Sequence, residues 1–110
     1  MVGMTVFLLT VQLKSDTDHA RLAEMVPKIM EQVRDISGGN SSQFFRSTDG
    51  ILFGLLLESK LKARQIRAIL DTAAIFQHED SFILNEIGED FAGAGFSTAW
   101  SWMQSRLRKD

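Results

Sequence analysis

The chain contains no cysteine, and this absence excludes disulfide bonds, zinc–thiolate sites and cysteine nucleophiles. The apolar run from Met4 to Leu13 is interrupted by threonine and glutamine and is too short to span a bilayer. No positively charged segment precedes this run, and no small-residue cleavage site follows it. We therefore expect a cytoplasmic protein that has no membrane partner.

A clear basic excess is also missing, because 12 Lys and Arg residues stand against 14 Asp and Glu residues, for a net charge of −2. Dedicated nucleic-acid binders usually carry a marked positive charge. Any contact with DNA or RNA would therefore depend on a local patch. A chain of 110 residues can bury one hydrophobic core without help from disulfides or metal ions. We therefore expect residues 1–110 to form a single domain.

What the chain does contain is a regular order of apolar patterns. Strand-like runs rich in β-branched and large apolar residues alternate with segments that repeat apolar residues at helical spacing. Asp49-Gly50 between two strand-like runs is a strong hairpin signal. The predicted elements are a strand over residues 5–13, a helix over 18–36, strands over 42–47 and 51–58, a helix that Ser59 caps, a strand over 82–87 and a helix that begins at Ser97.

This order predicts an α+β fold, the ferredoxin-like split β-α-β (βαββαβ) antiparallel sheet with an added C-terminal helix. Polar residues from Ser15 to Asp18 supply N-cap candidates for the first helix, and Gly38 with Gly39 stops it. Gly54 inside the third strand marks a bulge or a close approach of the backbone.

A candidate metal site follows from this topology. The first strand ends at the same edge of the sheet as the hairpin turn and the start of the fourth strand, and both histidines of the chain fall there. Carboxylates with imidazoles can hold Mg²⁺ or Mn²⁺, and a bound ion can activate water against a phosphodiester. Ordinary loop polarity and helix capping explain the same residues without a metal. The candidate ligands are Asp16, Asp18, His19, His78 and Asp80, with Asp49 and Glu79 nearby.

A second candidate is a basic stretch near the start of the second helix. Arg64 and Arg67 lie one turn apart and share a helix face, with lysines just before them. Such a row can contact successive phosphates of DNA or RNA. A solvated helix face explains it equally well. The candidate nucleic-acid-binding residues are Lys60, Lys62, Arg64 and Arg67.

Two further features lie near the C-terminus. The glycine-rich loop over residues 88–96 lacks the Lys-Ser/Thr of a phosphate-binding loop, and we interpret it as a turn before the last helix. Trp100 and Trp102 lie two positions apart, so on a helix they face different ways. One can pack on the sheet, which leaves the other for a partner subunit or for solvent.

The segments ARQIRAIL (63–70), DSFILNEIG (80–88) and DFAG (90–93), the region of Trp102 and the opening strand resemble the small bacterial SinR-like proteins. These are relatives of the second CRISPR-associated integration protein. The resemblance implies a ferredoxin-like homodimer joined through its sheets, near nucleic acid as a scaffold or a metal-dependent nuclease. In the CRISPR relatives an aspartate at the end of the first strand is the candidate metal ligand, whereas Gln12 stands near that position here. A neutral amide is a poor substitute for a carboxylate on a hard cation.

Three functions remain open at this point. The leading one is a non-catalytic homodimeric interaction module in which the sheet or the C-terminal helix makes the interface and the basic stretch of the second helix is the candidate contact with nucleic acid. The alternatives are a divalent-metal-dependent nuclease and a small-molecule-binding dimeric ferredoxin-like protein with a cavity between sheet and helices. Nucleophilic catalysis has no support, because the chain has no Gly-x-Ser-x-Gly motif and neither histidine has a triad context.

Overall fold

The computed structural model describes residues 3–88, 90 and 97–107, with the backbone alone at residues 97–100. Its elements follow the predicted order, so the α+β prediction is confirmed. None of the helices in these residues is long and apolar enough to cross a membrane. The elements are β1 (Thr5–Gln12), α1 (His19–Ser37), β2 (Ser41–Arg46), β3 (Leu52–Ser59), α2 (Ala63–Thr72), β4 (Ser81–Ile87) and α3 (Ser97–Leu107).

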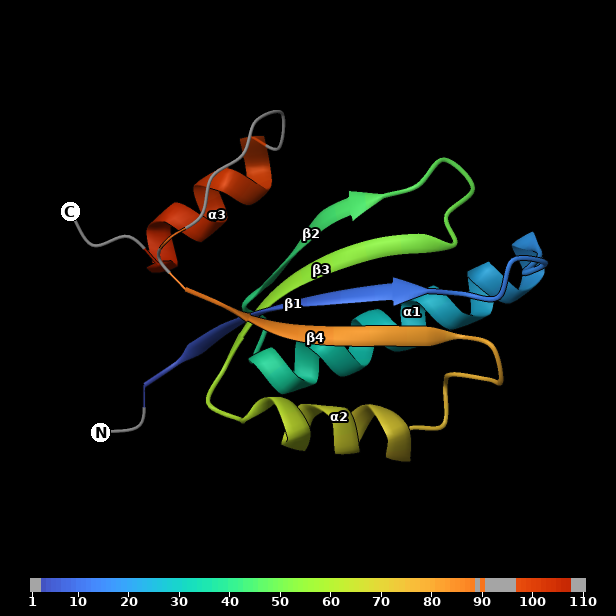
Figure 1. Cartoon of the computed structure of the whole chain (residues 1–110), viewed down its shortest axis with the longest axis horizontal. Coiled ribbons are helices and arrows are strands. Elements are labelled where there is room, and N and C mark those ends of the chain that lie inside the picture. Colours follow the sequence, from blue (N-terminus) through green and yellow to red (C-terminus); the bar gives the residue numbers. More distant parts are fainter. Residues whose placement is uncertain (1–2, 89, 91–96, 108–110) are drawn as a thin grey trace.

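The four strands form one antiparallel sheet in the order β2-β3-β1-β4, which is the ferredoxin-like arrangement (Figure 1). β1 lies inside the sheet and pairs with β3 from Thr5 to Gln12 and with β4 from Val6 to Gln12, without a register shift in either pairing. β2 and β4 are therefore the two edges of the sheet. α1 contacts β3 and β2, whereas α2 contacts β4.

The main core lies between the sheet and these two helices. Because successive strand residues point to opposite faces, the odd-numbered residues of β1 and β3 face the helices together. Ile29 and Val33 of α1 and Ile66 and Leu70 of α2 cover them, each almost fully buried. We call this side of the sheet the inner face.

The opposite side, the outer face, is covered in part by α3. Met103, 5% exposed, packs on Leu56 of β3, and Trp102 adds to the same cluster. α3 does not cover the half of this face that contains Ile83 and Leu52. Ile83 of β4 is 57% exposed and Leu52 of β3 is 37% exposed there.

The β2–β3 hairpin confirms two local predictions. Gly50 has a φ of 78°, a left-handed conformation that glycine adopts without strain, at the turn marked by Asp-Gly. A register shift between Gln43 and Phe45 places a bulge in β2, opposite Gly54 of β3. The Phe45 ring lies so close to Gly54 that a Cβ there would stand 2.3 Å from Phe45 Cε1. Glycine is needed at this position because the ring occupies the space of a side chain.

The helix boundaries confirm one expectation and correct another. Asp18 is the N-cap of α1 and accepts a hydrogen bond from the Arg21 N–H at 2.8 Å, and Gly38 ends the helix with a φ of 61°. Ser59 does not cap α2, since the helix begins at Ala63 with Lys62 as N-cap. The buried Ser59 hydroxyl instead donates to the Ile36 carbonyl and accepts from the Leu61 N–H, both at 3.1 Å.

Candidate functional site

The sheet edge that carries both histidines is organised around Asp80. Its carboxylate accepts hydrogen bonds from the Lys14 N–H at 2.9 Å and the Gln77 N–H at 2.7 Å. The Arg21 guanidinium binds both carboxylate oxygens, with Nη1 3.2 Å from Oδ1 and Nη2 on Oδ2. The Asp80 side chain is 0% exposed and that of Arg21 is 18% exposed. One buried carboxylate thus ties the β1–α1 loop, α1 and the segment before β4 together.

These contacts set the protonation of the pair. Burial alone would raise the pKa of Asp80, but the hydrogen bonds from Arg21, Gln77 and Lys14, together with the Arg21 charge, outweigh it and hold the pKa below its ordinary value. The hydrogen bond to Asp80 likewise raises the pKa of Arg21. Both groups are therefore charged at neutral pH, and every oxygen of the carboxylate already has partners.

The other predicted ligands at this edge lie on the surface. His19 is the first residue of α1 and His78 lies in the turn before β4, and both are exposed. Asp16 lies 3.6 Å from the Lys14 ammonium, with 72% of its side chain exposed. Asp18 serves as the N-cap of α1, as the capping alternative predicted for this residue.

The five candidate ligands do not fit a metal centre as they are placed. Within residues 3–88, 90 and 97–107, no three His, Asp or Glu side chains come together in a group that could hold an ion. Asp80 is committed to Arg21 and Asp18 to the end of α1. Binding of Mg²⁺ or Mn²⁺ there remains a prediction from the sequence.

The residues of the basic stretch are all exposed around the start of α2, with Lys60 lining the cavity beside α1 and Arg64 and Arg67 lining a groove beside β4. Lys60 and Lys62 precede the first turn, and Arg64 and Arg67 follow on the helix. Arg67 Nε lies 3.4 Å from Asp71 Oδ2, one turn further along. Among the described residues, the other members have no acidic partner. We call Lys60, Lys62, Arg64 and Arg67 the basic helix face.

A groove runs between this surface and the edge of the sheet. It has a volume of about 530 Å³ and lies between α2 and the first half of β4. Phe82 and Leu84 of β4 supply apolar walls, and the charged lining residues are Arg64, Arg67, Asp71 and Asp80. The Phe76 ring packs on Phe82 with ring centroids 4.9 Å apart. We call it the β4 groove, and it lies between α2 and an edge strand.

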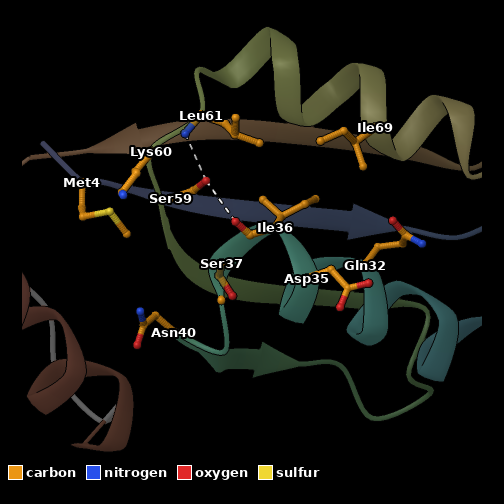
Figure 2. Close-up of a pocket in the computed structure, with 11 residues that line it drawn as sticks. Met4, Gln32, Asp35, Ile36, Ser37, Asn40, Ser59, Lys60, Leu61 and Ile69 are labelled. Atoms are coloured by element: carbon orange, nitrogen blue, oxygen red, sulfur yellow. Dashed lines mark hydrogen bonds between the residues drawn. The ribbon is translucent and has the colours of Figure 1, made fainter. Parts of the chain in front are cut away.

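A second cavity, of about 520 Å³, lies where the end of α1 meets the start of α2 (Figure 2). Ile36, Leu61 and Ile69 make its lining mostly apolar, and the charged Asp35 and Lys60 are exposed to solvent. Figure 2 shows that the Ser59 hydroxyl is occupied by its bonds to the main chain of residues 36 and 61. A cavity with this lining suits an apolar ligand and offers little to recognise a particular one.

The tryptophans and the glycine-rich loop are described in part. Trp102 packs within its own chain, with the Arg106 guanidinium 4.2 Å from the centroid of its ring. Arg106 Nε also lies 3.9 Å from Glu58 Oε1 of β3, which anchors α3 to the sheet. The Trp100 side chain and most of the loop over residues 88–96 lie outside the described residues. An interface through Trp100 stays a prediction.

Comparison with known proteins finds no matching family model, no matching curated protein and no matching solved structure. The function must therefore be inferred from the fold and from the arrangement of the side chains.

The sequence analysis missed the central role of Arg21. It correctly brought the end of the first strand and the start of the fourth to one edge, because the topology requires it. Nothing in the local sequence indicates that Arg21, on the first turn of α1, reaches a carboxylate 59 positions away. The only signal is the N-cap Asp18, which fixes where that turn begins.

Proposed function

We propose that this chain is a non-catalytic interaction module that works as a homodimer joined through the β4 side of its sheet. One observation carries the proposal. Ile83 of β4 is 57% exposed, the most of any large hydrophobic side chain in the described residues, and it stands on an edge strand of the sheet. An exposed apolar residue on an edge strand is typical of a surface that another chain covers.

The exposed residues around Ile83 support an interface there. Leu52 is 37% exposed on the same face, and Thr10 of β1 lies directly opposite Ile83 in the β1–β4 ladder. α3 covers the other half of this face, so the open half is the part left for a partner. The resemblance to SinR-like proteins, which implies a homodimer joined through its sheets, points the same way.

Light scattering coupled to size exclusion tests the proposal. We expect the wild-type chain to elute with twice the mass of one copy, and Ile83→Lys to shift it toward the monomer. Ile69→Lys is the matched control, because Ile69 is 36% exposed and lies on α2, away from the outer face. A wild-type monomer throughout the micromolar range would refute the homodimer.

Nucleic-acid contact is a second candidate function, favoured by the basic helix face. Its lysines are exposed, and neither has an acidic partner in the described part of the chain. Cations free of intramolecular pairs are available to replace counterions on phosphates. Because the net charge is −2, such contact would depend on a local basic patch of this kind.

Anisotropy of labelled duplex DNA and RNA, titrated with protein at several salt concentrations, tests this candidate. We expect Lys60→Ala with Lys62→Ala to lower the slope of log K against log salt by about two, as the loss of two phosphate contacts requires. Lys28→Ala with Arg34→Ala, exposed cations of α1, should leave the slope unchanged. Equal slopes for both double variants would exclude Lys60 and Lys62 as phosphate contacts.

A further inference from the structure

The directions of the main-chain groups along β4 follow from two hydrogen bonds next to the sheet. Leu13 donates its N–H to the Ile51 carbonyl at 2.7 Å, so odd-numbered residues of β1 bond to β3 and even-numbered residues bond to β4. Lys14 agrees, since its N–H points to the β4 side and reaches Asp80. Even-numbered residues of β1 lie opposite odd-numbered residues of β4. The N–H and C=O groups that point away from the sheet are therefore those of Phe82, Leu84 and Glu86.

This row of groups has no partner within the described part of the chain. β4 pairs with β1 alone, and no side chain there hydrogen-bonds to the outward main-chain groups. β4 has no proline, no lysine and no bulge, and Glu86 is its one charged residue. It is a regular strand ready to pair.

We propose that two copies of the chain pair their β4 strands edge to edge, antiparallel, around a two-fold axis at Leu84, so that the two sheets become one. The inference rests on the proposed homodimer and specifies its contact. Its register is fixed by the outward groups. With Leu84 facing the partner's Leu84, Phe82 pairs with the partner's Glu86, and Glu86 pairs with the partner's Phe82. Only this register pairs all the outward groups of both strands with one another.

Charge complementarity favours the same register. Glu86 is exposed and has no cationic partner among the described residues, and Arg64 has no acidic one. The partner's Glu86 would stand opposite Phe82, which lines the β4 groove together with Arg64 and Arg67. Because Arg67 is already paired with Asp71, each copy would thus place one carboxylate on the side of the other copy's Arg64. Symmetry forms the contact twice.

The register also accounts for the exposed side chain on the outer face. Ile83 would lie opposite the partner's Asn85 and diagonal to the partner's Ile83, close enough for the two isoleucines to touch. Its 57% exposure would then fall on dimerisation. The edge pairing therefore uses both the free main-chain groups and the exposed apolar residue of β4.

A proline at position 86 tests the edge pairing. Glu86→Pro removes an outward N–H, while the ladder to β1, which uses the odd-numbered residues, keeps all its bonds. Glu86→Ala is the matched control, because it removes the carboxylate and keeps the N–H. We expect Glu86→Pro to raise the dissociation constant of the dimer roughly tenfold or more and Glu86→Ala to raise it less. Circular dichroism confirms that both variants are folded.

Single cysteines give a second, independent measurement, which the cysteine-free chain makes unambiguous. Residues facing each other in a hydrogen-bonded antiparallel pair have Cα atoms about 5.5 Å apart, within the range of a disulfide. Leu84→Cys should therefore form an intermolecular disulfide under mild oxidation. Ile83→Cys, whose partner in this register is Asn85, should cross-link far less.

The outcomes separate the contact from the dimer itself. A wild-type dimer that Glu86→Pro weakens and that Leu84→Cys cross-links supports the edge pairing. If the wild type is dimeric but Glu86→Pro matches Glu86→Ala and Ile83→Cys cross-links better than Leu84→Cys, the dimer stands and the Leu84 register is wrong. A wild-type monomer would overturn both proposals.

Discussion

Arg21 and Asp80, 59 positions apart in the sequence, form a buried ion pair that joins the first turn of α1 to the residue before β4. Main-chain N–H groups of Lys14 and Gln77 complete the shell around the carboxylate. The contact lies at the sheet edge that the sequence marks as a candidate metal site. The ion pair and its hydrogen bonds hold two loops and a helix together, which is a structural role.

Removing one member of this pair should be costly. Asp80→Asn leaves the Arg21 guanidinium largely buried without its counter-charge, and we expect a loss of about 3 kcal/mol in the free energy of unfolding. Urea denaturation measures it. Asp16→Asn is the control, because its side chain is 72% exposed and its ion pair with Lys14 is long, so a change below about 0.5 kcal/mol is expected. Similar losses in the two variants would contradict this structural role.

The same carboxylate should govern stability in acid. The folded state lowers the pKa of Asp80, so the stabilising contribution is complete above the unfolded pKa of about 3.9 and is lost as pH falls through the folded value. We expect the wild-type chain to lose stability below about pH 4 more steeply than Asp80→Asn. Denaturation curves at a series of pH values test this. Parallel pH profiles would show that Asp80 does not titrate with folding.

Gly54 should tolerate no side chain while Phe45 stands over it. The Cβ of Gly54→Ala would lie 2.3 Å from the ring, so the ring must move, at a cost of about 1–3 kcal/mol. In Phe45→Leu the ring is gone, and the added cost of Gly54→Ala should fall. A double-mutant cycle by chemical denaturation measures this coupling. Additive losses would mean that the ring does not confine position 54.

The attachment of α3 should depend on Met103. This residue is 5% exposed and packs on Leu56, while the neighbouring Gln104 is exposed. Met103→Ala removes most of the apolar contact, at a cost of about 2 kcal/mol or more, and should release α3 before the sheet unfolds. Hydrogen exchange should then show faster exchange in residues 101–107 and unchanged protection in β1. Gln104→Ala should leave both unchanged.

The fold can be predicted from the sequence because it depends on the periodicity of apolar residues and on the turn residues that separate the elements. Asp49-Gly50 marks the hairpin, and Gly38 ends α1 where expected. The start of α2 is misplaced by a few residues because the Ser59 hydroxyl, a plausible cap, is used to bond Ile36 and Leu61 instead.

The candidate site is harder to predict than the fold, since it depends on pairs that are distant in the chain. Topology brings Asp80 near the β1–α1 loop, yet only the three-dimensional structure selects Arg21 as its partner. The unpaired edge of β4 likewise cannot be predicted from the periodicity of apolar residues. It emerges from the strand order and from the register that places Thr10 opposite Ile83.

The bulge between Gln43 and Phe45 has a consequence for the size of the assembly. A sheet with two regular edges can keep adding copies and grow into a fibre, whereas a bulged edge is a poor template. If two copies pair through β4 as proposed, the regular edge of each copy is used, and β2, which contacts α3, remains at either end. In the proposed dimer the bulged β2 strands would be the only free edges, so the bulge would limit the assembly to two copies.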